Sequence, residues 1–182
     1  MVATGRDYSY GLMLVLLFTL FSFQGAKAQD GGRIGLWLSD EELSSLPVTG
    51  DSWEKMLSYA RNTTNDPDLQ DQDDKTDTNT VAKALVYART GDTTYAEEVV
   101  YTLQRLLELH PVSRSLEWDE LGTSRAIGAY VIAADLVDLE NYAPDFDKNH
   151  FRPWLASARF ADTEGGRGSI VEVHEKRPNN HG

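Results

Sequence analysis

Apolar residues recur every three or four positions along much of the chain, and this spacing predicts helices rather than strands. Ser39 and Glu42 have the Ser-x-x-Glu spacing of a capping box, so we expect a short helix to begin there and to end before Pro47. Asp51-Ser52 precedes a second helix, which is predicted to run through Arg61. Its apolar face consists of Trp53, Met56, Leu57 and Ala60.

Two longer helices are predicted on either side of Gly91-Asp92. The first begins at Thr80, and the second is capped by Thr93 or Thr94 and ends at His110-Pro111. The apolar stripe of the second helix consists of Tyr95, Val99, Leu103, Leu106 and Leu107. Because only a tight turn separates them, the two helices are expected to form an antiparallel hairpin.

The segment 121–139 is apolar on almost every side, which predicts an inner helix covered by its neighbours. One more amphipathic helix is predicted over 145–158, and the glycines within 165–168 separate it from the final segment. No stretch of useful length alternates between apolar and polar residues. The chain is therefore predicted to be all-α, built from successive antiparallel helical hairpins.

Several large side chains invite specific roles. Trp118 lies beside acidic residues in a loop-like stretch and is our candidate for stacking on a sugar ring. The other tryptophans are expected in the core, namely Trp37, Trp53 and Trp154. Arg125 is expected to form a structural ion pair with one of three acids, Asp119, Glu120 or Asp135.

Residues 62–79 form a polar stretch with six aspartates, which is predicted to be a loop. Clustered carboxylates raise the alternative of a calcium site, but the stretch lacks the central glycine and the regular ligand spacing of an EF-hand loop. A solvated acidic loop is favoured. The triplet Asn62-Thr63-Thr64 is an acceptor sequence for N-linked glycosylation, which matters only in a cell that glycosylates.

The N-terminus indicates the compartment. Residues 11–23 are almost all apolar, Arg6 precedes them, and the small residues that end at Ala28 match a signal-peptidase site. Residues 1–28 are therefore predicted to be a signal peptide and 29–182 the mature domain, which is secreted or periplasmic. A membrane anchor is the alternative, but the apolar run is shorter than the roughly 20 residues that span a bilayer.

Composition narrows the function classes. The absence of cysteine excludes a disulfide framework, a thiol nucleophile and a thiolate zinc site, and the net charge of −12 disfavours nucleic acid and anionic membranes as partners. The charge is uneven, because residues 148–182 carry six Lys or Arg and four Asp or Glu, whereas the rest carries eleven and twenty-five. An anionic ligand is therefore expected near the C-terminal end.

The C-terminal string HEKRPNNHG, residues 174–182, gathers acids, bases, amides and two histidines around one proline. The proline favours a turn or a new helix start, behind which Asn180 and His181 can converge on one point. A capping amide and a surface imidazole are the alternative for these two residues. His174 and Arg177 can also pair with neighbouring glutamates. The spacing of the histidines does not fit a zinc-protease motif, so no metal site is expected.

Three upstream segments accompany this string in order along most of the mature chain: IGLWLSDEEL (34–43), KALVYARTGD (83–92) and YVIAADLVDL (130–139). Together they resemble the alginate lyase family of polysaccharide lyases, whose fold is an (α/α) toroid of helical hairpins. The resemblance implies an incomplete (α/α) toroid, formed by the N-terminal portion of such a domain. It also implies a secreted enzyme that cleaves a uronate polymer such as alginate by β-elimination.

In β-elimination the proton to be removed lies next to a carboxylate, which must first be neutralised by hydrogen-bond donors. A base then takes the C5 proton, and an acid protonates the departing glycosidic oxygen. The resemblance implies that Asn180 binds the uronate carboxylate and that His181 is the base. An amide donates without competing as a base, and an imidazole has an ordinary pKa of about 6.5. The implied substrate-binding residues are Asn179, Arg177 and His174.

The partner implied by the resemblance is an acidic polysaccharide, and no cofactor is expected. The family also uses an Arg and a Tyr that come later than this motif, so we expect the chain to be an N-terminal portion with little turnover by itself. The alternative is a non-catalytic secreted helical module that binds carbohydrate or serves as a scaffold. The sequence leaves open which uronate polymer is used and what the oligomeric state is.

Overall fold

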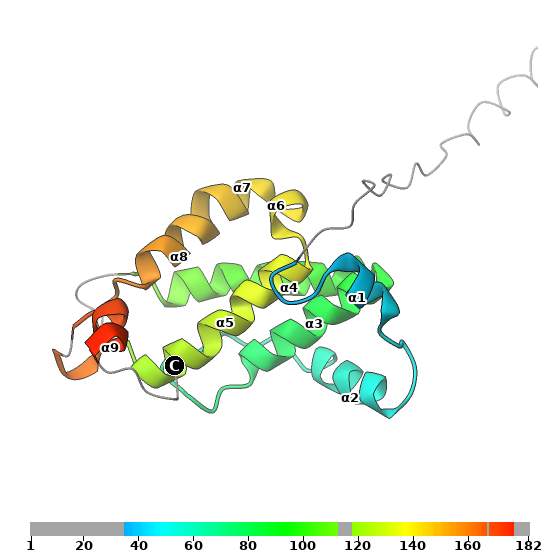
Figure 1. Ribbon diagram of the computed structural model, residues 1–182, viewed down its shortest axis with the longest axis horizontal. Coiled ribbons are helices and arrows are strands. Elements are labelled where there is room, and N and C mark those ends of the chain that lie inside the picture. The colour runs from blue at the N-terminus through cyan, green and yellow to red at the C-terminus, as the bar shows by residue number, and fades with distance from the viewer. Residues whose placement is uncertain (1–34, 113–117, 167, 177–182) are drawn as a thin grey trace, which may run out of the picture. The chain divides into compact units, whose positions relative to one another are not determined.

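The computed structural model describes residues 35–112, 118–166 and 168–176 (Figure 1). This part of the chain is mostly helical, and the β pairing within it is limited to isolated bridges. The predicted all-α class is therefore confirmed. None of the helices in these ranges is long and apolar enough to cross a membrane. The predicted signal peptide, residues 1–28, lies outside the described residues.

The first two helices follow the predicted pattern closely. Helix α1 (Asp40–Ser45) begins at the predicted capping box, in which Ser39 Oγ accepts from the Glu42 backbone N–H at 3.2 Å and the Glu42 carboxylate accepts from the Ser39 N–H at 2.9 Å. Helix α2 (Asp51–Ala60) begins two positions earlier than predicted. Its N-cap is Gly50, whose positive φ of 91° suits glycine, so Asp51 and Ser52 lie inside the helix.

Helices α3 (Thr76–Thr90) and α4 (Thr93–Leu109) pack against each other across a two-residue turn, which confirms the predicted hairpin. Gly91 ends α3 in the left-handed conformation, with φ 72°. The cap of α4 is Asp92, which accepts from the Thr94 N–H at 3.1 Å, so the prediction of a threonine cap was wrong. A carboxylate next to the turn reaches the free amides as readily as a hydroxyl.

The acidic loop is shorter than predicted, because α3 begins four residues before Thr80. Several of its aspartates accept backbone N–H groups two residues ahead and so stabilise local turns. These acceptors are Asp68 for Gln70, Asp71 for Asp73 and Asp74 for Thr76, at 2.8, 2.8 and 3.0 Å. Within the described ranges no group of three or more acidic or histidine side chains is arranged to hold a metal ion.

Helix α5 (Glu120–Leu136) packs chiefly against α3 and also contacts α4 and α6 (Leu139–Tyr142). Its buried side chains include Ala126, Tyr130, Ala133, Ala134 and Leu136. Gly128 is exposed, so the helix is covered on most sides but not on all. The prediction of an inner helix is confirmed, but this helix ends at Leu136 and not at Leu139.

The predicted ion pair of Arg125 with Asp119 or Asp135 is not among the described contacts, and the side chain of the third predicted partner, Glu120, lies outside the described residues. Arg125 Nη1 donates to Gln72 Oε1 at 3.3 Å. Two of the predicted acid partners have structural roles of their own, because Asp119 caps α5 through the Gly122 N–H and Asp135 accepts from the Leu36 N–H at 2.8 Å.

The chain from 144 to 158 is helical throughout, which confirms the helix predicted over 145–158. Its pieces are α7 (Pro144–Phe146), the π-helical turn η1 (Asp147–Phe151) and α8 (Arg152–Ala158). Three glycines then take positive φ values that other residues rarely adopt, namely Gly165, Gly166 and Gly168. Gly165 and Gly166 belong to the single-turn 3-10 helix η2 (Glu164–Gly166). Together with Gly168 they separate α8 from α9 (Ile170–Lys176), as predicted.

The main hydrophobic core joins α3, α4, α5 and α8. Trp53 and Trp154 are buried, as predicted. Trp118 is only 1% exposed, so its assignment as a sugar-stacking residue was wrong. Trp37 is 51% exposed, so its assignment to the core was wrong as well. It precedes the cap of α1 and belongs to no helix, and therefore has no apolar helix face to join.

Candidate functional site

The sequence places its candidate site in the string 174–182, and most of this string lies outside the described residues. That holds for Arg177, Asn179, Asn180, His181 and for the side chain of His174. The backbone of His174 lies in α9. The described part of the site is therefore α9 and the elements that support it.

A second capping box opens α9. The Ser169 N–H donates to Glu172 Oε2 at 2.9 Å, and the Glu172 N–H donates to Ser169 Oγ at 3.4 Å. The backbone hydrogen bond from Ser169, followed by that from its hydroxyl, lowers the pKa of Glu172. The Ser-x-x-Glu spacing is the sequence signal for this start, and the prediction did not use it.

Backbone hydrogen bonds attach the start of α9 to the end of α8. The Ile170 N–H donates to the Ala161 carbonyl at 3.1 Å, and the Val171 N–H donates to the Arg159 carbonyl at 3.0 Å. The Val173 side chain is 3% exposed and fixes the inner face of the helix. Helix α9 is therefore held by its own cap, by the chain before it and by one buried side chain.

The same segment also contacts the start of α5. The Trp118 N–H donates to the Asp162 carbonyl at 2.8 Å, and Trp118 and Thr163 form an isolated parallel bridge. The Trp118 ring lies 5.8 Å from the Trp154 ring of α8, centroid to centroid. These rings thus connect the segment that leads into α9 with the core.

His110, at the end of α4, completes this aromatic group. Its ring lies edge-on to Trp118 with 6.4 Å between centroids, and its carbonyl accepts from Trp154 Nε1 at 2.8 Å. Its Nε2 lies 2.9 Å from the Pro67 carbonyl and 3.3 Å from the Leu69 nitrogen. Because its contacts are to backbone groups in the interior, His110 connects the acidic loop to the helices and is not available as a base for an external ligand.

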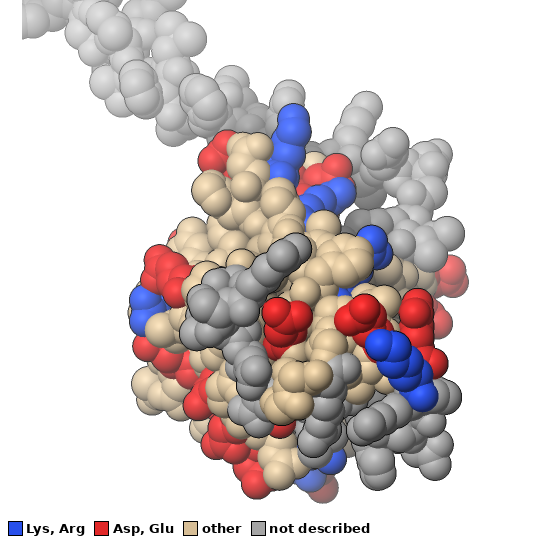
Figure 2. Space-filling model, turned by 90° about the vertical axis from the view of Figure 1, so that its left-hand side faces the viewer, with Lys and Arg blue, Asp and Glu red and all other residues tan. Residues whose placement is uncertain are grey.

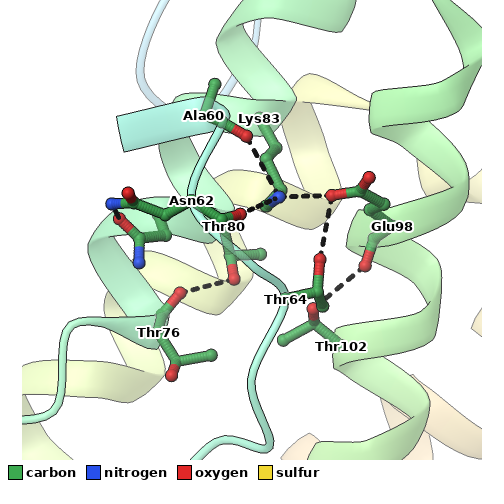
Figure 3. A network of polar contacts seen from close by, with 9 residues as sticks. Ala60, Asn62, Thr64, Thr76, Thr80, Lys83, Glu98 and Thr102 are labelled. Atoms are coloured by element: carbon green, nitrogen blue, oxygen red, sulfur yellow. Dashed lines mark hydrogen bonds and ion pairs between the residues drawn. The ribbon is translucent and has the colours of Figure 1, made fainter. Parts of the chain in front are cut away.

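A separate cluster of polar contacts surrounds the buried Lys83 between α2, α3 and α4 (Figure 3). Lys83 of α3 is 2% exposed, and its ammonium group donates to the Ala60 carbonyl at 3.0 Å, to the Asn62 carbonyl at 2.9 Å and to the Glu98 carboxylate. The same Glu98 oxygen accepts from Thr64 Oγ1 at 2.8 Å. We call these five residues the Lys83 network.

The Lys83 network has a structural role. An ammonium group has three hydrogens, and each of those of Lys83 has an oxygen partner. A catalytic amine needs a free lone pair, which this geometry does not provide. Glu98, whose side chain is 38% exposed, is the member of the ion pair that faces solvent. The network therefore fastens the chain after α2 to the α3–α4 hairpin.

Sequence reasoning missed this network, although a signal for it exists. Four polar residues of α3 are buried at helical spacing on one face, namely Thr76, Asn79, Thr80 and Lys83. Spacings of three, four and seven residues place side chains on a single helix face. A polar stripe on a helix that also has an apolar stripe predicts a second, polar packing surface.

An acidic hollow of about 280 Å³ lies beside α5, α6 and α8. Asp135, Asp138, Glu140 and Asp147 contribute carboxylates to its lining. Arg152 pairs with two of them, donating to Asp147 at 2.6 Å and to Glu140 at 2.8 Å. An excess of carboxylates repels an anionic sugar, so this hollow does not suit a uronate polymer.

Charges of both signs alternate on the end of the molecule that carries α9. Figure 2 looks onto this end, and among the side chains drawn in colour it shows basic groups standing singly beside acidic ones. The described side chains there therefore form no continuous basic patch. An anionic ligand at this end would therefore have to be bound by individual hydrogen-bond donors, which is the role that the sequence predicts for the amides of the C-terminal string.

Comparisons with protein-family models, with curated proteins and with solved structures found no match. The resemblance to the alginate lyase family therefore stays a prediction from the residues quoted above.

Proposed function

We propose that this chain contributes the N-terminal helical hairpins of a secreted polysaccharide lyase, which cleaves a uronate polymer such as alginate by β-elimination. The proposal rests above all on the string HEKRPNNHG and on α9, which contains its first residues. The finer fold, an incomplete (α/α) toroid, is part of the same proposal and is supported by the α3–α4 hairpin and the inner position of α5.

The segments that carry the family resemblance also contact one another, which supports treating them as one unit. The Leu36 N–H donates to Asp135 at 2.8 Å, which joins the segment 34–43 to the segment 130–139. The segment 83–92 belongs to α3 and its turn, and α3 packs against both α1 and α5.

In the proposed reaction Asn180 donates hydrogen bonds to the uronate carboxylate, so that the negative charge that develops on its oxygens is stabilised. His181 takes the C5 proton, a double bond forms between C4 and C5, and the bond from C4 to the glycosidic oxygen breaks. A proton donor completes the departing hydroxyl. Asn179, Arg177 and His174 orient the sugar.

The direct test is the ultraviolet absorbance of the unsaturated uronate that forms when the full chain, and any longer product of its gene, is incubated with alginate. His181→Ala and Asn180→Ala are each expected to lower the rate at least about 100-fold, since each removes one acid–base or charge-stabilising group. His150→Ala is the matched control, because His150 is exposed and stacks on Phe146 of the same helical run. Its rate should be unchanged.

The same measurement separates the lyase from the alternative, a non-catalytic carbohydrate-binding or scaffold module. If neither the full chain nor a longer product of its gene forms unsaturated uronate ends, although the protein binds alginate, the non-catalytic module is favoured. An unchanged rate in His181→Ala would show that His181 is not the base.

If His181 acts as a base with an ordinary pKa, the rate of the active protein rises with pH through about 6.5.

A further inference from the structure

The triplet Asn62-Thr63-Thr64 is the single Asn-X-Ser/Thr sequence among the 182 residues, and its middle residue is not proline. It follows α2 directly, in a segment without regular secondary structure. An acceptor asparagine needs such an exposed, irregular segment, because the attached sugar is bulky and must stay in solvent.

The side chain of Asn62 is exposed and lies on the outer side of the Lys83 network. Figure 3 shows it directed away from Glu98, on the opposite side of the Lys83 ammonium group. Its Nδ2 donates one hydrogen bond, to Asn79 Oδ1 at 3.0 Å. The carboxamide nitrogen carries two hydrogens, so one is left for a new bond while the contact with Asn79 is kept.

The backbone of the triplet is held by hydrogen bonds even though Asn62 as a residue is exposed. The Asn62 carbonyl accepts from Lys83 at 2.9 Å, and the Thr64 hydroxyl donates to Glu98 at 2.8 Å. A sugar on Asn62 therefore displaces none of the hydrogen bonds of the Lys83 network. The Thr64 hydroxyl bonds to Glu98 only once α4 has packed, so in the chain before packing this hydroxyl is free to take part in recognition of the acceptor sequence.

We propose that Asn62 is a site of N-linked glycosylation. In the transfer, Asn62 Nδ2 forms a bond to C1 of the first sugar, and the bond from C1 to the diphosphate of a lipid-linked oligosaccharide donor breaks. One amide proton and the lipid diphosphate are released. The inference depends on the proposed export of the chain and is independent of the lyase chemistry.

The test is expression of the full chain in a eukaryotic cell, followed by electrophoresis before and after treatment with an endoglycosidase that removes N-linked glycans. We expect a shift that corresponds to one glycan. Asn62→Gln abolishes it. A matched pair leaves Asn62 and its contact with Asn79 in place: Thr64→Ser keeps the acceptor sequence and the shift, whereas Thr64→Val removes both. A shift that survives in Thr64→Val overturns the assignment to Asn62.

A second arm separates this inference from the proposed export. The same chain is expressed with residues 1–28 replaced by the signal peptide of a protein known to be secreted. Glycosylation with the replaced signal but not with the chain's own N-terminus supports the Asn62 site and refutes the export proposal. Absence of the glycan with both N-termini overturns the Asn62 site, provided that the protein is recovered from the secretory pathway.

Discussion

Two buried regions of this protein stabilise it in different ways. The Lys83 network contains a charge whose every hydrogen has an oxygen partner, whereas the aromatic group of His110, Trp118 and Trp154 contains rings in edge-on and tilted contact. The first depends on complete pairing, because an unpaired buried charge is costly. The second depends on volume, because a lost ring leaves a cavity.

The two regions also support different parts of the chain. The Lys83 network fastens residues 60–64 to the α3–α4 hairpin. The aromatic group joins the end of α4, the start of α5 and α8, and Trp118 contacts the segment that leads into α9. Damage to the aromatic group should therefore reach the C-terminal string, and damage to the network should not.

Trp118→Ala is expected to have the largest effect, a loss of about 4 kcal/mol in the free energy of unfolding, because it leaves a large cavity in the core. Urea unfolding of the full chain, followed by far-ultraviolet circular dichroism, measures it. The amide of Val173, which donates to the Ser169 carbonyl, should also exchange its hydrogen faster. Trp37→Ala is the control, since its side chain is 51% exposed and its loss should cost less than about 0.5 kcal/mol.

Lys83→Met is expected to cost about 2–3 kcal/mol, because the Glu98 carboxylate loses its counter-ion and two backbone carbonyls lose their donor. The cost stays below that of a fully buried pair, since the Glu98 side chain is 38% exposed and water screens its charge. The double variant Lys83→Met with Glu98→Gln should recover part of the loss, because the unpaired charge is gone and Thr64 still has an acceptor. In Lys83→Met the Val173 amide should exchange its hydrogen no faster than the lower global stability requires. Faster exchange than that would contradict the separation of the two regions.

Features set by neighbours in sequence were predictable. The capping box of Ser39 and Glu42 involves residues three apart, and its local pattern is sufficient to form it. The turn at Gly91 is another such case, since glycine adopts its positive φ without strain. In both places the structure agrees with the spacing that was used to predict it.

Features set by distant contacts were not predictable. Trp118 is the sugar-stacking candidate of the sequence because acidic residues flank it in a loop-like stretch, but it is buried and its ring contacts His110 and Trp154. The oxygens of Ala60 and Asn62 that pair with Lys83 belong to the preceding helix and loop. The start of α3 was placed too late for the same reason, since its first turn is polar and is buried by tertiary contacts. The candidate site could be proposed from the sequence alone because its residues are contiguous.

The smallest expected effect comes from a change in the cap of α9, the helix that lies between the aromatic group and the C-terminal string. Hydrogen bonds from the Ser169 backbone and hydroxyl hold the pKa of Glu172 below its usual range, so the folded chain binds this proton less readily than the unfolded chain. The cap therefore contributes stability above the ordinary glutamate pKa of about 4.3 and loses it as the pH falls through the lowered value. An NMR titration of the Glu172 carboxyl should show the depressed pKa, and it should show a partial rise towards the ordinary value in Ser169→Ala, which loses the hydroxyl but keeps the backbone N–H donor. Ser169→Thr keeps the hydroxyl and should keep most of the depression. A Glu172 pKa that already has the ordinary value in the unchanged chain would mean that the cap does not form, and α9 would then depend only on its backbone contacts with the end of α8. A Glu172 pKa that is the same in Ser169→Ala would mean that the hydroxyl contributes nothing to the cap.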